Sequence, residues 1–315
     1  MRKLFKTSVA AALTLAASTA VADFPTDKEI TFVIPYSAGG GFDTIVRTFT
    51  PALEADLGTS VVPKNIKGAS GTRGGQAVAR ADADGYTIGI FNIPGLTVSQ
   101  VMDRDIGFDL GKITWIANLA SVKYAIAVKS DSEVNSLKDL CDLDRPIKLS
   151  DTGKDSTSSI TSVIAFDIIG CPITNVTGYD GSNDTMIAVM RGEVDATLKP
   201  VSSLGKYVKS GDLRMIVTLS DESLVEGVPT TTELGYPELA RFGLNRVVGG
   251  PEGMSADVVA RLQDGFKAAI ESESVTAWAA SSRTTLNFMN AEDTGAMMDT
   301  LSNFYLQYKP LLEAK

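Results

Sequence analysis

The sequence predicts an α/β protein with two domains, and three observations lead to that fold class. The chain has 315 residues, more than one domain usually contains. With 44% hydrophobic and 21% charged residues, it has enough apolar side chains for a large core and too many charges for a membrane bundle. Short apolar segments also alternate with segments of helical periodicity, which is typical of strands and helices in alternation.

The first two elements follow directly after residue 29. Ile30–Ile34 is a short apolar run that predicts a strand, and apolar residues at helical spacing between 45 and 57 predict the next helix. From Ser255 to Lys309 the pattern predicts consecutive helices with no strand between them. We expect the other strands at 61–62, 86–91, 115–119, 124–128, 147–150, 174–177, 194–198 and 213–219, and the other helices at 74–82, 95–102, 156–169, 183–191 and 202–209.

Residues 1–22 have the features of a secretory signal peptide. A start with three basic residues is followed by a short apolar run at 9–17, and Ala20-Val21-Ala22 has the small-x-small pattern of a cleavage site. We therefore expect cleavage after Ala22 and export to the periplasm, with no lipid anchor because no cysteine lies near that site. The alternative, an amphipathic first helix of the fold, is disfavoured because the apolar run has no polar face.

The charge balance excludes several classes of function. The chain has 29 basic and 38 acidic residues, a net charge of −9, and removal of Arg2, Lys3 and Lys6 with the signal peptide would leave 26 basic and 38 acidic residues, a net charge of −12. Nucleic acids and anionic membranes are bound by basic surfaces, so neither partner is expected. Histidine is absent, which excludes Ser-His-Asp and Cys-His catalysis and histidine-ligated zinc. We expect no catalytic residue, no metal and no cofactor.

The sequence contains two cysteines, Cys141 and Cys171. In an exported protein an even number of cysteines in one region indicates a disulfide, here one that closes a loop of about 30 residues. The alternative is a pair of buried free thiols.

The most informative motif is the glycine-rich loop at 35–43, PYSAGGGFD, between the first predicted strand and the first predicted helix. The first N–H groups of a helix have no partner within the helix, and the helix dipole makes that end attractive to an anion. The loop matches neither the dinucleotide nor the triphosphate fingerprint, so a smaller anion such as a carboxylate is the expected ligand. The alternative is a tight turn in which Asp43 serves only as a first-turn charge.

Two more loops have the same polar and glycine-rich character. Residues 65–75 open a helix in the first half of the chain, and residues 150–159 open one in the second half, where Ser156 is also a candidate helix cap. Loops at the carboxyl ends of parallel strands from two domains form a cleft that suits a small ligand.

Several short motifs occur once each along the chain, in a fixed order. These are IPY at 34–36 with GGG at 39–41 and Asp43, Asn65 with GASG at 68–71, ADGYT at 83–87, YDGS at 179–182, RGEVD at 191–195, SGDLR at 210–214, VPT at 228–230 and ELGYP at 233–237. The set resembles the extracytoplasmic solute receptors of the tripartite tricarboxylate transporter family, also called Bug receptors, over nearly the whole chain after residue 22.

The resemblance implies a two-domain type II periplasmic binding protein fold with crossover strands at the hinge. Residues 23–122 together with 247–315 would form domain 1, and 123–246 would form domain 2. The domains would close on a small organic carboxylate, either a mono- or a dicarboxylate. A monomeric receptor would then deliver it to a membrane permease of one large and one small subunit.

The expected ligand-binding residues lie on the first-domain loop, on the second-domain loop and at strand ends near them. They are Tyr36, Ser37, Ala38, Gly39, Gly40, Gly41, Asp43, Asn92, Thr152, Gly153, Ser156, Thr157, Tyr179, Asp180 and Lys199.

The chain departs from the family pattern at several positions. Asp155 and Ser159 stand where the family has a small residue and then a histidine, and Gly178 replaces the usual proline. Arg246 lies near the position of a family tryptophan, and Lys199 follows a strand where no cation is expected. Each of these two cations is either a ligand contact or a surface charge.

Three other functions stay open at this point. An enzyme on the same fold would have to use Asp43, Asp151 or Asp155 for metal binding or acid–base chemistry, but carboxylates near helix starts are also ordinary caps. A receptor of this fold could serve a different class of transporter. It could also report its carboxylate to a membrane signalling kinase.

Overall fold

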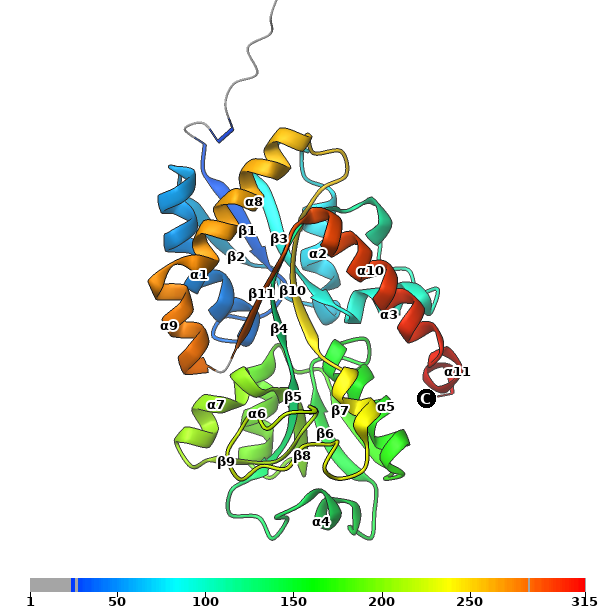
Figure 1. Ribbon diagram of the computed structural model, residues 1–315. Helices are drawn as coiled ribbons and strands as arrows, with labels where there is room; N and C mark the ends of the chain where they lie inside the picture. The colour runs from blue at the N-terminus through cyan, green and yellow to red at the C-terminus, as the bar shows by residue number, and fades with distance from the viewer. Residues whose placement is uncertain (1–23, 26–27, 283, 315) are drawn as a thin grey trace, which may run out of the picture.

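The computed structural model describes residues 24–25, 28–282 and 284–314. They form two lobes, each built around one β-sheet with helices packed on it (Figure 1). The predicted signal peptide and its cleavage site lie outside the described residues. Within the described ranges, no helix is long and apolar enough to cross a membrane.

The first lobe contains a six-stranded sheet with the strand order β11-β4-β10-β3-β1-β2. β1 pairs in parallel with β2 and β3, whereas β10 runs antiparallel to β3 and β4. The strands are β1 (Ile30–Ile34), β2 (Val61–Asn65), β3 (Thr87–Ile93), β4 (Thr114–Val122), β10 (Leu244–Gly250) and β11 (Thr285–Met289). The helices of this lobe are α1 (Gly41–Leu57), α2 (Thr72–Ala79), α3 (Gly95–Val101), α8 (Ala256–Glu271), α9 (Glu273–Ser282), α10 (Ala291–Leu306) and α11 (Lys309–Glu313), with the 3-10 turns η1 (Ala69–Gly71) and η2 (Leu110–Lys112).

The second lobe contains a five-stranded sheet with the strand order β7-β6-β8-β5-β9. β6 pairs in parallel with β7 and β8, and β5 runs antiparallel to β8 and β9. The strands are β5 (Tyr124–Lys129), β6 (Ile147–Asp151), β7 (Ile173–Thr177), β8 (Ala196–Pro200) and β9 (Leu213–Thr218). The helices are α4 (Leu137–Cys141), α5 (Thr157–Ile169), α6 (Ser182–Met190) and α7 (Val201–Lys209), followed by the 3-10 turn η3 (Pro237–Arg241).

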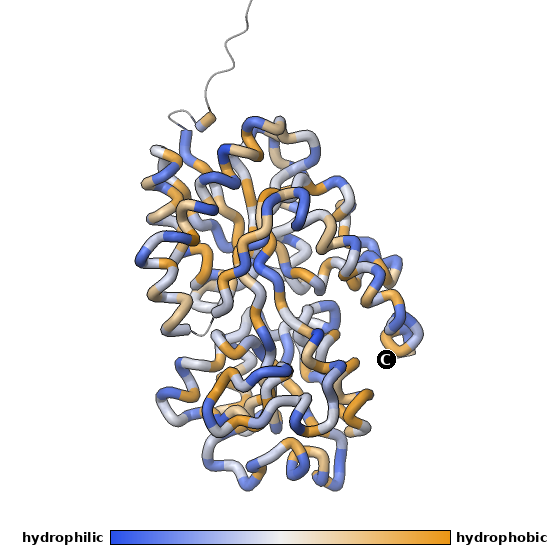
Figure 2. The backbone as a smooth tube through the Cα atoms, viewed as in Figure 1, coloured by the Kyte–Doolittle hydropathy of each residue, from blue (hydrophilic) through white to orange (hydrophobic). Residues whose placement is uncertain are grey.

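α1 shows why the sequence forms these elements. Ile45, Val46, Phe49 and Leu53 repeat at helical spacing, and all four are at most 1% exposed. The helix ends at Gly58, which adopts a φ of 72° that other residues rarely adopt. Figure 2 shows the same alternation of hydrophobic and hydrophilic residues along the outer helices, as expected when one helix face packs on a sheet.

The two sheets are joined by a direct strand crossing. β4 ends at Val122 and β5 begins at Tyr124, so Lys123 alone separates strands of different sheets. The chain returns through η3 into β10, which pairs with β4 from Leu244 onward. Because the lobes are connected by extended strands, the backbone can bend between them at only a few residues. This limits the relative orientations that the two lobes can adopt.

The sequence predicted the two-domain α/β fold correctly, and the strands and helices expected up to residue 219 are present within a few residues of their predicted bounds. The prediction of no strand between Ser255 and Lys309 is wrong, because β11 pairs with the edge of the first sheet at β4. In β11, Leu286 and Phe288 pack against the core and alternate with Asn287. A strand of five residues is too short for its periodicity to distinguish it from a helix.

Cys141 and Cys171 form a disulfide with a Cα–Cα distance of 5.4 Å. It joins the end of α4 to the segment before β7, on the side of the second lobe away from the first lobe (Figure 1). The chain-entropy model gives a stabilisation of about 3–4 kcal/mol for a loop of this length.

Candidate ligand-binding site

A cavity of about 30 Å³ lies between the two lobes, and we call it the inner cavity. The loop after β1 and the start of α1 bound it from the first lobe, and the start of α5 bounds it from the second. Its lining residues are Tyr36, Gly40, Gly41, Phe42, Asn92, Tyr124, Thr152, Ser156, Thr157, Ser158, Ser182, Lys199, Pro200, Leu244 and Arg246.

The loop before α1 is shaped by Asp43. Its Oδ2 accepts the Gly39 N–H at 2.8 Å, and its Oδ1 accepts from Arg47 Nε at 2.9 Å and from Asn65 Nδ2 at 3.0 Å. Burial alone would raise the pKa of Asp43, but the hydrogen bonds from Gly39, Asn65 and Arg47 outweigh burial and lower it. Asp43 therefore holds the loop rather than presenting free carboxylate oxygens to a ligand.

This loop leaves the start of α1 open to the cavity. The cap residue Gly40 makes no side-chain hydrogen bond to the helix, so the first-turn N–H groups at Gly41 and Phe42 have no side-chain acceptor from the cap. An anion at this position would accept from those N–H groups and be favoured by the helix dipole.

On the second lobe, the start of α5 surrounds a buried ion pair. Lys199 Nζ donates to Asp151 Oδ1 at 2.7 Å and to Ser158 Oγ at 2.9 Å, and Lys199 is 1% exposed. Ser156 Oγ also donates to Asp151 Oδ1, at 3.1 Å, and accepts the Ser159 N–H as the cap of α5. The positive charge of Lys199 is therefore balanced inside the lobe by Asp151.

Thr157 connects the two lobes directly. Its Oγ1 donates to Asn92 Oδ1 at 2.6 Å and accepts the Gly95 N–H at 2.7 Å. Asn92 in turn donates to the carbonyl of Ser70 at 3.1 Å, as does the Tyr36 hydroxyl at 2.8 Å. The two bonds of Thr157 cross between the lobes and hold them closed around the inner cavity, whereas the bonds to Ser70 lie within the first lobe.

Arg246 enters the cavity from β10. It is 3% exposed, and its Cζ lies 4.1 Å from the centroid of the Phe42 ring. Among the described residues its Nη1 has no hydrogen-bond partner and no carboxylate forms an ion pair with it. Burial lowers the pKa of Arg246 to about 10, as expected for a buried cation that lacks a counter-charge.

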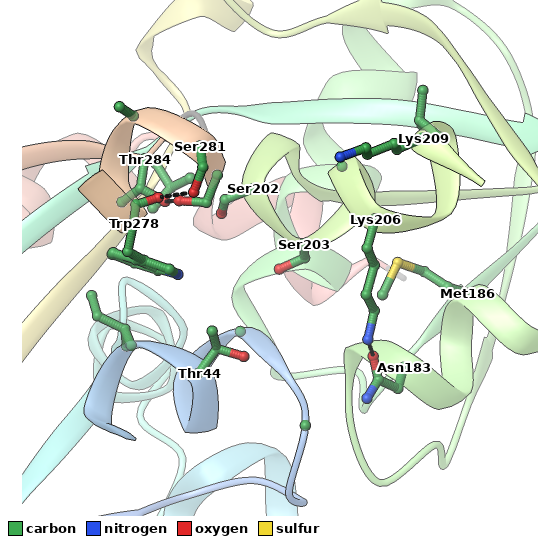
Figure 3. Close-up of a pocket in the computed structure, with 18 of the residues that line it drawn as sticks. Thr44, Asn183, Met186, Ser202, Ser203, Lys206, Lys209, Trp278, Ser281 and Thr284 are labelled. Carbon is green, nitrogen blue, oxygen red and sulfur yellow. Dashed lines mark hydrogen bonds between the residues drawn. The ribbon is translucent and has the colours of Figure 1, made fainter. Parts of the chain in front are cut away.

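A second cavity, the outer groove, begins where the inner cavity ends. It has a volume of about 790 Å³ and shares Gly41 and Arg246 with the inner cavity. Trp278 from α9, Thr44 from α1 and Ser203 from α7 point into it (Figure 3). The remaining lining residues are Gly39, Ile45, Val122, Asn183, Met186, Ser202, Gly205, Lys206, Val208, Lys209, Val225, Ala280, Ser281, Ser282 and Thr284.

A model of the tripartite tricarboxylate transporter family receptor matches residues 45–303. The chain belongs to this receptor family. Among its relatives is protein BugT of Bordetella pertussis, which is 24% identical over 79% of this chain and 78% of BugT. The family consists of solute-binding receptors rather than enzymes.

Solved structures show the same fold. The periplasmic binding protein BugD has a TM-score of 0.84 at 22% identity, covering 90% of this chain and 97% of BugD. MatC from Rhodopseudomonas palustris with bound malate has a TM-score of 0.82 at 20% identity, covering 92% of this chain and all of MatC (100%). Rpa4515 from R. palustris with adipate has a TM-score of 0.83 at 23% identity, covering 92% of this chain and 99% of Rpa4515.

The receptor brings many of the expected ligand-binding residues together at the inner cavity. Those that line it are Tyr36, Gly40, Gly41, Asn92, Thr152, Ser156, Thr157 and Lys199.

The other expected residues lie elsewhere. Gly39 lines the outer groove, Ser37 faces Gly181 across the lobes, and Asp180 forms an exposed ion pair with Lys67. Ala38, Asp43, Gly153 and Tyr179 line neither cavity. Tyr179 packs beside the core of the second lobe.

Sequence reasoning did not place Phe42, Tyr124, Ser158, Ser182, Pro200 or Leu244 at the inner cavity, and it left the role of Arg246 open. Phe42, Ser158 and Ser182 were recognisable, because they lie within the loops and motifs identified at 35–43, 150–159 and 179–182. Tyr124 was not, because it begins a strand whose first five residues are all buried, and nothing in the sequence distinguishes it from the other core residues of that strand. Within the described ranges, no cluster of three or more potential metal ligands occurs.

Proposed function

We propose that this protein is a periplasmic receptor that captures a small organic carboxylate by closure of domain 1 (23–122 and 247–315) onto domain 2 (123–246), with residues 244–246 assigned to domain 1 because β10 pairs with β3 and β4. It then delivers the acid to a membrane permease of one large and one small subunit. The inner cavity carries the proposal, because both lobes line it and Thr157 closes it by bonding across to Asn92 and Gly95. A ligand bound there would favour the closed state over the open one.

The chemistry of the cavity favours an anion. The open N-terminus of α1 offers N–H groups, and the lining contains Arg246 as a cation without a carboxylate partner among the described residues, whereas Asp151 neutralises Lys199. With a net charge of −9, the long-range field of the protein repels anions, so selection has to come from these local groups. MatC was solved with malate and Rpa4515 with adipate, which supports a carboxylate as the ligand of this related fold.

A thermal-shift screen of the purified exported protein tests ligand capture. The panel contains acetate, malate, adipate and benzoate, each paired with its uncharged amide. An acid at 100 times its dissociation constant stabilises the native state by about 2.7 kcal/mol, which raises the unfolding temperature by roughly 4 °C for a chain of this size. If the amides stabilise the protein as well as the acids do, the carboxylate is not what the receptor recognises.

Delivery and export require two further measurements. Intact mass of the periplasmic protein should correspond to a chain that begins at Asp23 with the disulfide formed. Uptake of the acid identified in the screen should stop in cells that lack this receptor and return when the full chain is supplied. Unchanged uptake in the deletion strain would argue against delivery.

A further inference from the structure

The charged side chains that are buried differ in whether they are paired. Four are buried in the described part of the chain: Asp43, Asp151, Lys199 and Arg246. Asp43 is paired with Arg47, and Asp151 is paired with Lys199. Arg246 alone has no opposite charge, although buried charges are normally paired or neutralised.

The closed site therefore carries one uncompensated positive charge. The ion pair of Asp151 and Lys199 is neutral, and the cation–π contact of Arg246 with Phe42 orients the guanidinium without supplying a counter-charge. One bound carboxylate would balance the site.

The Arg246 guanidinium faces an unpaired hydroxyl across the space beside Gly41, which its Nη2 approaches more closely than the unpaired Nη1 does. A methyl group added to Gly41 would lie 2.9 Å from Arg246 Nη2 and 2.7 Å from Ser203 Oγ, so both side chains converge on this point. Ser203 Oγ is buried and, among the described residues, has no hydrogen-bond partner. Because Gly41 is the first residue of α1, the open helix N-terminus faces the same space.

The outer groove continues from this point. Its lining includes the cations Arg246, Lys206 and Lys209, and no aspartate or glutamate among the described residues. Trp278 supplies a large apolar surface on the opposite side of the groove from Lys206 (Figure 3). The groove therefore suits the carbon skeleton of an organic acid whose carboxylate lies at Arg246.

We propose that Arg246 is the counter-ion of the ligand carboxylate in this receptor. The guanidinium, the Ser203 hydroxyl and the first N–H groups of α1 bind the carboxylate beside Gly41, and the rest of the acid extends past Trp278 into the outer groove. The proposal rests on the proposed function and assigns the carboxylate its partner. It also assigns the ligand class, an extended organic acid that is too long to fit in the inner cavity alone and therefore occupies the outer groove as well.

Calorimetric titration with acetate, malate, adipate and adipamide tests the assignment. Arg246→Met should weaken binding of the acids by about 10- to 150-fold, the range for a lost charge-assisted hydrogen bond. Arg241→Met removes the same charge from the 3-10 turn η3 and is the control, with unchanged affinity expected. Adipate should bind the wild-type protein more tightly than acetate, and Trp278→Ala should reduce that difference while leaving acetate unaffected.

A second variant tests the geometry without any added ligand. Ser203→Asp places a carboxylate opposite Arg246, so it should raise the unfolding temperature of the ligand-free protein and prevent adipate binding. Thr300→Asp adds a carboxylate on the exposed surface of α10, outside both cavities, and should do neither. Gly41→Ala should block acid binding, because its methyl group would fill the space between Ser203 and Arg246.

The outcomes separate this proposal from the proposed function. If Arg246→Met binds adipate as the wild-type protein does, the receptor function stands and Arg246 is not the counter-ion. If no acid binds the wild-type protein, carboxylate capture fails, and the Ser203→Asp measurement still decides whether Arg246 lacks a counter-charge. Equal unfolding temperatures for Ser203→Asp and Thr300→Asp would overturn the assignment. A lower unfolding temperature for ligand-free Arg246→Met would also overturn it, because that result makes Arg246 a structural cation.

Discussion

The two buried cations at the inner cavity, Lys199 and Arg246, come from different lobes and are in opposite electrostatic situations. Lys199 is bonded to Asp151 and Ser158 within the second lobe, whereas Arg246 faces the cavity with Nη1 unpaired. Both are at most 3% exposed, so burial alone does not distinguish them. The difference shows that a cation at a binding site can belong to the fold or to the ligand, depending on whether its counter-charge is present in the protein.

The largest expected effect concerns Lys199. Lys199→Met removes the partner of Asp151 and leaves a buried carboxylate without compensation, so the free energy of unfolding at pH 7 should fall by about 3–5 kcal/mol. Urea unfolding measures the change. Arg246→Met, which leaves no charge unpaired, should show no such loss.

Two further variants sharpen this test. Lys129→Met disrupts an ion pair with Asp131 that is largely exposed, and it should leave the unfolding midpoint nearly unchanged. Adding Asp151→Leu to Lys199→Met removes the orphaned carboxylate and should recover much of the lost stability. A loss below about 1 kcal/mol for Lys199→Met alone would mean that Asp151 does not depend on Lys199 and would remove the contrast with Arg246.

The next effect concerns closure. Thr157→Val keeps the shape of the side chain but removes the bonds to Asn92 and Gly95 across the lobes, so the closed state loses about 1–3 kcal/mol. Calorimetric titration with the tightest acid from the screen should show a loss in affinity of about 5- to 150-fold.

Thr161→Val is the matched control for closure. The Thr161 hydroxyl donates to the Thr157 carbonyl inside α5 and does not cross to the first lobe. Its removal should change affinity little. An equal loss in both variants would mean that α5 itself, and not the bond across the lobes, limits binding.

The smallest effect is the pH dependence of the first-lobe loop. The folded pKa of Asp43 lies below its usual value, so its contribution to stability is present above the unfolded pKa of about 3.9 and is lost as the pH falls through the folded value. Asp43→Asn should lower the free energy of unfolding by about 1 kcal/mol at pH 7 and by less at pH 3. Urea unfolding at both values measures this, with the exposed Asp299→Asn as the control. If the difference in the free energy of unfolding between the wild-type protein and Asp43→Asn were larger at pH 3 than at pH 7, the role assigned to Asp43 would be wrong.

Most of the fold and part of the site could be predicted from the sequence, because these features depend on residues that are close together in the chain. Strand and helix periods, the glycine-rich loop at 35–43 and the serine cap of α5 each depend on neighbouring residues, and the structure confirms these elements. β11 was missed because an edge strand of five residues has too few alternations to identify it, and its pairing with β4 joins segments far apart in the chain.

Comparison of the sequence with the family pattern identified Lys199 and Arg246 as unusual positive charges, each either a ligand contact or a surface charge. It could not determine which one is free to bind an acid, because a counter-charge depends on distance in space. Asp151 lies 48 residues from Lys199 and becomes its partner only because β6 and β8 are neighbours in the sheet. Ser203 and Gly41 come from different lobes, and only their approach to Arg246 places an open helix N-terminus, an unpaired hydroxyl and an unpaired guanidinium around one point.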